Sequence, residues 1–68
     1  MRYAVVFEKS ENSFGAYVPD LPGCIAVGQS LAEAKLAISD AMRQHLEALK
    51  ADGKSPPVPA SVCAYIDA

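Results

Sequence analysis

A single amphipathic helix is the feature that most constrains the fold of this chain. Ser30 and Glu33 form a capping box at its start, in which each side chain can accept a hydrogen bond from the other residue's backbone amide. Apolar residues then recur at helical spacing from Leu31 until Gly53, a residue type that commonly follows a helix end. Because one helix covers only one face of a sheet, the remaining residues must account for the other face.

The predicted helix has an apolar side and a charged side. The apolar side comprises Leu31, Ala34, Ile38, Ala41, Met42, His45, Leu46, Ala48 and Leu49. The charged side comprises Glu33, Asp40, Arg43, Gln44, Glu47 and Lys50. Lys35 breaks the pattern on the apolar side, where its stem can lie along apolar surface, and Leu36 breaks it among the charges. Leu36 is therefore a candidate contact residue.

Strand-like composition precedes and follows this helix. The segments are residues 2–8, 14–19, 24–28 and 61–66. They are rich in β-branched and aromatic residues, and the polar residues 9–13 predict a hairpin loop after the first segment. Pro22 and Gly23 predict a type II turn before the third segment, and we expect Asp20 to cap its own backbone beside that turn.

These elements predict an α+β fold of order β-β-β-α-β. Residues 54–59 contain three prolines and form a stiff, extended connector after the helix. The right-handed crossover rule places the last strand parallel to the first and beside it. We therefore expect a four-stranded mixed sheet of order 3-2-1-4, with the helix on one face, as a single domain over residues 1–68.

Both faces of the predicted sheet carry apolar residues, which indicates an interface. A domain of this size buries only about 60% of the surface its unfolded chain exposes, so a partner or a second copy is expected to add stability. The alternative is that loops fold over the uncovered face. The candidate residues for a partner or homo-oligomer interface are Tyr3, Val5, Phe7, Tyr17, Tyr65 and Leu36.

Charge and hydropathy exclude several classes of function. The net charge of −2 provides no basic field for generic affinity to RNA or DNA. No apolar stretch is long enough to cross a membrane, and the N-terminal residues lack the pattern of a signal peptide. We therefore expect a cytoplasmic protein that has no membrane partner.

No catalytic, metal or cofactor site is expected. His45 lies on the apolar side of the helix without a carboxylate at an orienting spacing. Cys24 and Cys63 lack metal-binding spacing, and we expect buried reduced thiols that lie too far apart for a disulfide. A metal-dependent nuclease needs several carboxylates at one rim, whereas only Glu8 and Asp20 lie on or beside strands in the first half.

An RNA-binding sheet is the main alternative reading. The rings of Tyr3, Phe7, Tyr17 and Tyr65 could stack on unpaired bases. Only Arg2 and Lys9 flank those strands as cations, and nearby acidic residues outnumber them. Core and interface packing therefore explains the rings better than RNA stacking does.

Several motifs at this spacing strongly resemble the HicB-like antitoxin family. They are Val18-Pro19-Asp20-Leu21-Pro22-Gly23-Cys24, then Gly28-Gln29-Ser30-Leu31-Ala32-Glu33-Ala34, then His45-Leu46, and finally Pro56-Pro57-Val58-Pro59. The resemblance implies a truncated ribonuclease-H-like fold that lacks the nuclease carboxylates. It also implies a non-enzymatic role, in which the protein binds and blocks a small, basic, mRNA-cleaving toxin of the HicA type.

Two further expectations accompany this resemblance. Longer members of the family commonly carry a C-terminal DNA-binding domain, which these residues lack, so no direct DNA binding is expected. The acidic residues could complement a cationic toxin surface and steer association. They are Glu8, Glu11, Asp20, Glu33, Asp40 and Glu47.

Overall fold

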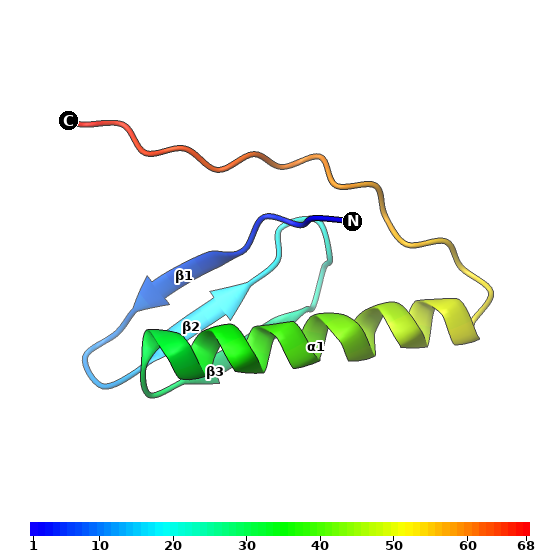
Figure 1. Cartoon of the computed structure of the whole chain (residues 1–68), viewed down its shortest axis with the longest axis horizontal. Helices are drawn as coiled ribbons and strands as arrows, with labels where there is room; N and C mark the ends of the chain where they lie inside the picture. Colours follow the sequence, from blue (N-terminus) through cyan, green and yellow to red (C-terminus); the bar gives the residue numbers. More distant parts are fainter.

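Three short strands precede one long helix in the computed structural model, which describes residues 1–68. The elements are β1 (Val6–Lys9), β2 (Phe14–Tyr17), β3 (Ile25–Gly28) and α1 (Leu31–Ala51). The strands form an antiparallel sheet of order β1-β2-β3, and α1 packs against it mainly through β2 and β3 (Figure 1). The α+β class is therefore confirmed.

The strand register determines which side chains share a face. Phe7 lies opposite Ala16, which in turn lies opposite Ala26. Cross-strand partners point to the same side of a sheet, and successive residues alternate between sides. This row packs with the core beneath α1, so the adjacent residues of each strand point away from the helix.

The core lies between α1, the sheet and the loop that joins β2 to β3. Its buried residues are Ala16, Val18, Leu21, Cys24, Ala34 and Ile38. Partly buried residues pack around it, namely Tyr3, Val5, Phe7, Ala26, Ala41, Met42 and Leu46. With only 6 of 68 residues buried, this core leaves little stability in reserve.

Both ends of α1 are capped as the sequence predicts. The Ser30 hydroxyl accepts from the Glu33 amide at 3.1 Å, although the Glu33 carboxylate accepts from the Gln29 amide rather than from Ser30. At the other end Gly53 has φ +73°, and the Lys54 amide donates to the Leu49 carbonyl at 2.9 Å. This arrangement is a Schellman motif, which satisfies the last helix carbonyls.

The predicted type II turn is also confirmed. Pro22 precedes Gly23, whose φ of +83° lies in the region that favours glycine. The Cys24 amide donates to the Leu21 carbonyl at 3.0 Å and closes the turn. The turn thereby directs Leu21 into the core.

A close backbone approach makes Gly28 irreplaceable at the junction of β3 and α1. A Cβ there would meet the backbone nitrogen of Ala34 and would lie 2.8 Å from the Glu33 carbonyl carbon. We expect Gly28→Ala to lower the free energy of unfolding by about 1–3 kcal/mol, because rigid backbone must shift. Urea unfolding followed by circular dichroism measures this loss.

Gly15→Ala is the matched control, because a Cβ at Gly15 would meet nothing within 4 Å. It should leave stability unchanged or raise it slightly. Equal losses in the two variants would contradict the steric explanation.

The predicted fourth strand is wrong. Residues 61–66 are extended but have no backbone hydrogen bond to β1 or to any other strand. The sheet is three-stranded, so the order 3-2-1-4 is wrong, and the fourth strand expected of a truncated ribonuclease-H-like fold is not formed. The first strand also begins at Val6 instead of residue 2.

Two anchors explain why this segment stays off the sheet. The Tyr3 hydroxyl donates to the Pro57 carbonyl at 2.6 Å, and the Asp20 carboxylate binds the backbone of Ala60 and Ser61. Prolines at 56, 57 and 59 supply no amide hydrogens for a ladder. The segment therefore runs beside β1 in the same direction without pairing with it (Figure 1).

Candidate functional site

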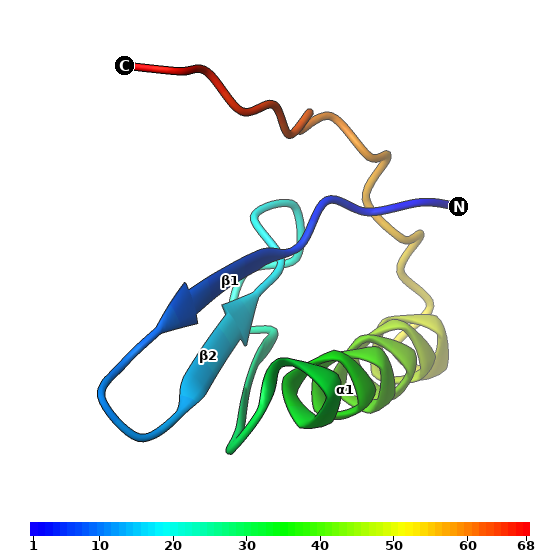
Figure 2. The same cartoon turned by 60° about the vertical axis from the view of Figure 1, so that its left-hand side comes forward.

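The sheet face opposite α1 carries uncovered apolar side chains. Val6, Tyr17 and Ile25 form one cross-strand row, and Val27 lies in the next row on the same side. The exposed fractions are 39% for Tyr17, 69% for Ile25 and 68% for Val27. Figure 2 shows α1 against one side of the sheet only. We call Val6, Tyr17, Ile25 and Val27 the open sheet face, and a contiguous apolar patch of this kind is typical of a protein contact surface.

Negative charge lies at one end of the open sheet face. Glu8 shares the row of Val27, and Glu11 lies in the adjoining β1–β2 hairpin loop. Neither carboxylate has a hydrogen bond or an ion pair within the chain. The other acidic residues of the predicted set are already engaged, namely Asp20 by residues 60 and 61, Glu33 by the Gln29 amide, and Asp40 and Glu47 by Arg43. Glu8 and Glu11 are thus the members of this set that have no partner within the chain.

The predicted interface residues lie on separate surfaces. Tyr3, Val5 and Phe7 point to the helix side and pack against the core. Tyr17 alone of the six lies on the open sheet face. Tyr65 is fully exposed beyond the sheet, and Leu36 is 72% exposed on the outer side of α1. Sequence reasoning missed Val6, Ile25 and Val27, because it assigned the uncovered face to the wrong set of alternating residues.

This arrangement also removes the aromatic platform of the RNA-binding alternative. Stacking of successive bases needs several rings on one accessible face. Tyr3 and Phe7 face the core, so Tyr17 is the one ring on the open sheet face. The sheet therefore resembles a protein contact surface more than a stacking surface.

Asp20 has a different role from the predicted one. Instead of capping its own turn, its Oδ2 accepts from the Ala60 and Ser61 amides, each at 3.0 Å, and its Oδ1 accepts from the Ser61 hydroxyl at 2.9 Å. The Ser61 amide, followed by the Ala60 amide and the Ser61 hydroxyl, lowers the pKa of Asp20. Asp20 therefore anchors the chain that follows the proline-rich connector.

We expect this anchor to depend on pH. A lowered pKa means that the ionised carboxylate binds residues 60 and 61 fully above its ordinary pKa of 3.8, and that the contribution is lost as pH falls through the lowered value. Asp20→Asn should remove the charge-assisted bonds at neutral pH, because a neutral amide is a weaker acceptor. Amide hydrogen exchange at Ala60 and Ser61 should then accelerate.

Asp52→Asn is a control for the loss of one exposed negative charge. It should leave exchange at Ala60 and Ser61 unchanged, because Asp52 caps α1 with its backbone and makes no contact with this segment. Unchanged exchange in Asp20→Asn would contradict the anchor.

The two cysteines have different environments. Cys24 is buried, and burial raises the pKa of its thiol. Cys63 is exposed, so the expectation that both thiols are buried is wrong for Cys63. Cys63 lies in residues 61–66, and it is exposed because this segment does not pair with the sheet. Both thiols are free.

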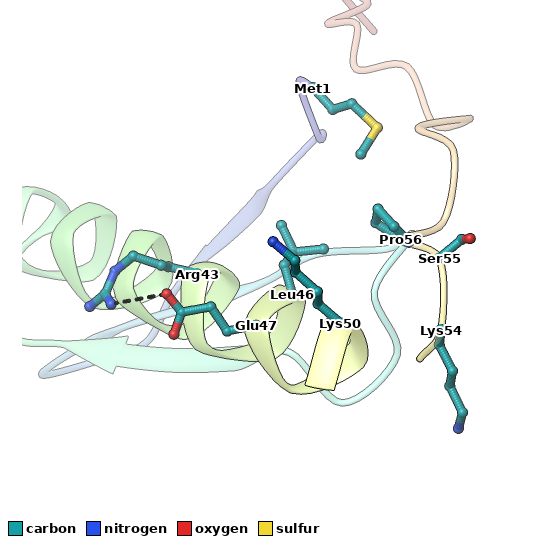
Figure 3. A pocket seen from close by; sticks show the side chains of 8 residues that line it. All are labelled: Met1, Arg43, Leu46, Glu47, Lys50, Lys54, Ser55 and Pro56. Atoms are coloured by element: carbon teal, nitrogen blue, oxygen red, sulfur yellow. Dashed lines mark ion pairs between the residues drawn. The ribbon is translucent and has the colours of Figure 1, made fainter. Parts of the chain in front are cut away.

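A further groove lies beside the end of α1. It has a volume of about 630 Å³, and its lining residues are Met1, Arg43, Leu46, Glu47, Lys50, Lys54, Ser55 and Pro56 (Figure 3). Its carboxylate, Glu47, lies 3.8 Å from Arg43 and is paired with it. No hydrogen bond joins Ser55 to Glu47 or to either lysine of the groove, so the lining shows no base paired with a nucleophile.

Metal-ligating side chains do not converge anywhere in the chain, because no three of its His, Cys, Asp or Glu residues are grouped. His45 is half-buried on α1. The helix α1 does not combine the length and hydropathy of a membrane span.

Comparison with known proteins identifies relatives of the whole chain. Residues 3–68 match the family described as "HicB_like antitoxin of bacterial toxin-antitoxin system". A solved structure described as "HicA3 and HicB3 toxin-antitoxin complex" contains a chain with a similar fold, at a TM-score of 0.73 and 30% identity. The alignment covers 88% of this chain and 70% of that one.

Curated relatives extend this similarity. An uncharacterised 14.9 kDa protein of Haemophilus phage HP1 is 33% identical over 67 residues, which cover 98% of this chain and 50% of the relative. A UPF0150 protein of Thermoplasma acidophilum is 36% identical over 58 residues, which cover 84% of each chain. The chain thus spans about half the length of the phage relative.

Proposed function

The chain belongs to the HicB-like antitoxin family, and we propose that it binds and neutralises a small, mRNA-cleaving toxin of the HicA type. Support comes from the family match over residues 3–68 and from the similarity to a chain of a solved toxin–antitoxin complex. In this proposal the protein acts by occupying the toxin's RNA-binding surface and catalyses no reaction. Because the toxin acts on mRNA, the complex would form in the cytoplasm.

The open sheet face is the proposed binding surface. Ile25 and Val27 are each about two-thirds exposed, although β2 holds their strand along one edge and α1 packs against its other face. Large apolar side chains on a rigid strand are suitable anchors, because little conformational entropy is lost when a partner covers them. These exposed apolar side chains on the open sheet face are the observation on which the proposal rests.

Charge at the rim favours a basic partner. Glu8 and Glu11 are unpaired beside the open sheet face, and the chain has a net charge of −2. Rim carboxylates chiefly raise the rate of association with a cationic surface. Their placement at the hairpin end would orient the toxin along the strands. The same charge disfavours direct binding of these residues to DNA.

Co-expression tests this function. A small basic protein encoded beside this chain should arrest growth when expressed alone, and co-expression of the chain should restore growth. The two proteins should also purify as one complex. If the neighbouring protein is toxic and this chain neither binds it nor restores growth, the antitoxin proposal fails.

Self-association is the remaining part of the proposal, because the small core leaves apolar surface exposed.

A further inference from the structure

The last residues of the chain have no partner within it. Residues 62–68, which we call the C-terminal arm, are extended and make no hydrogen bond to the rest of the chain. The exposed fractions are 91% for Val62, 102% for Tyr65 and 91% for Ile66. Its composition is typical of a strand, so both its backbone and its side chains are available for pairing.

The outer edge of β1 is unpaired as well. β1 is an edge strand of the sheet, and β2 occupies only its inner side. Residues 2–5 extend this edge toward the N-terminus without strand pairing. An open edge of this kind is a template for another strand.

A continuous groove separates the arm from this edge. One cavity of about 450 Å³ is lined by Arg2, Tyr3, Ala4, Ser61, Val62 and Cys63. The next, of about 350 Å³, is lined entirely by apolar residues: Val5, Val6, Phe7, Val62, Cys63, Ala64 and Tyr65. The order of these residues shows that the arm runs parallel to β1, with open space between the two.

We propose that the C-terminal arm of a second copy fills this groove. A two-fold axis between the two arms makes them antiparallel to each other. Because each arm runs parallel to β1 of its own chain, it is antiparallel to β1 of the other copy. Each arm then pairs with that β1 on one side and with the opposite arm on the other. Two three-stranded sheets thereby join into one sheet, and every free edge along the groove is paired.

The anchors explain why the arm reaches a second copy and does not close onto its own β1. Pro57 is held by Tyr3, and Ala60 and Ser61 are held by Asp20, so the base of the arm is fixed, and a cavity separates residues 61–63 from the edge at residues 2–4. The arm itself is unrestrained beyond Ser61. Both copies carry the same anchors, so the exchange is symmetric.

Charge complementarity gives the register. The arm has one charged side chain, Asp67, and β1 is preceded by one, Arg2. Antiparallel pairing with Asp67 opposite Arg2 places Cys63 opposite Val6. The same register places Val62, Ala64 and Ile66 on the helix side, opposite Phe7, Val5 and Tyr3, so apolar residues meet apolar residues.

Disulfide trapping tests this register with the native Cys63 as its probe. Directly opposed residues of antiparallel strands have Cα atoms about 4.5–5.5 Å apart, within the range of a disulfide. Mild oxidation of Val6→Cys should therefore yield a covalent dimer. Val27→Cys is the matched control, because Val27 lies on the same sheet face but on β3, at the far edge. It should yield none above the level given by Cys63 alone.

Sedimentation of the native chain, together with a proline variant, provides a second test. In the proposed dimer the Ala64 amide donates either to β1 of the other copy or to the opposite arm. Ala64→Pro removes this amide and should weaken dimerisation by about 100-fold. The monomer fold should be unaffected, because residue 64 makes no hydrogen bond there. Ala68→Pro, at the end of the arm, should leave the dimer intact.

These outcomes decide the proposal. A native dimer supports it, together with an interchain disulfide between Cys63 and the thiol introduced by Val6→Cys. A monomer at micromolar concentration, an intrachain bond, or a dimer that neither forms the interchain bond nor weakens in Ala64→Pro overturns it.

Discussion

Leu21→Ala is expected to lower the free energy of unfolding by about 2–5 kcal/mol, the range for removing a fully buried leucine. Leu21 has no exposed surface and is the largest fully buried side chain. It comes from the loop between β2 and β3, where the type II turn places it in the core cluster that also contains Ile38 and Val18. Neighbours fixed by a turn cannot easily collapse into the cavity, so the loss should be large.

Leu36→Ala is the control for the same chemical change at the surface. Leu36 is 72% exposed, so its removal should change stability by no more than about 0.5 kcal/mol. Urea unfolding of both variants at one protein concentration measures the difference. A loss below about 1 kcal/mol for Leu21→Ala would contradict a core centred on this loop residue.

Ile25→Asp is expected to weaken toxin binding by about 2–4 kcal/mol, or about 30- to 1,000-fold in Kd. The substitution places an unpaired carboxylate on the open sheet face, where binding would strip it of water. Ile25 is 69% exposed in the free chain, so the fold should tolerate the change.

Leu36→Asp is the matched control for this prediction, because Leu36 has a similar exposure on the outer side of α1. It should leave the Kd of the complex within about threefold of wild type, since rim substitutions contribute little. Isothermal titration with the purified toxin measures both. Loss of binding in Leu36→Asp alone would show that the toxin binds the outer side of α1 and not the open sheet face.

Locally determined features were predictable from the sequence. The Ser30 cap, the Gly53 helix end and the Gly23 turn each depend on residues within a few positions of one another. Their hydrogen-bonding and φ preferences apply whatever the rest of the chain does. Each was therefore correct to within about one residue.

Features that depend on distant contacts were not predictable in this way. Nothing local indicates that Asp20 binds residues 60 and 61, some 40 positions away in sequence. That contact and the Tyr3–Pro57 bond keep residues 61–66 off β1. Strand-like composition alone therefore predicted a fourth strand that does not form. Composition reports the capacity to pair, whereas tertiary anchors decide whether a partner is within reach.

The face of the sheet that α1 covers did have a signal in the sequence. Ala16, Ala26 and Gly28 fall on the same side of their strands, and small side chains allow a helix backbone to approach closely. Alternation then places Tyr17, Ile25 and Val27 on the other side. Reading small residues as the helix-facing set would have identified the open sheet face.

The most direct test of toxin binding at the open sheet face is methyl NMR of the chain, free and saturated with the toxin. We predict large shifts or broadening of the methyl signals of Val6, Ile25 and Val27, while the Leu36 methyls and the buried Leu21 methyls stay near their free positions. Perturbation centred on Leu36, with Ile25 and Val27 unchanged, would contradict the assignment of the open sheet face as the surface that neutralises the toxin.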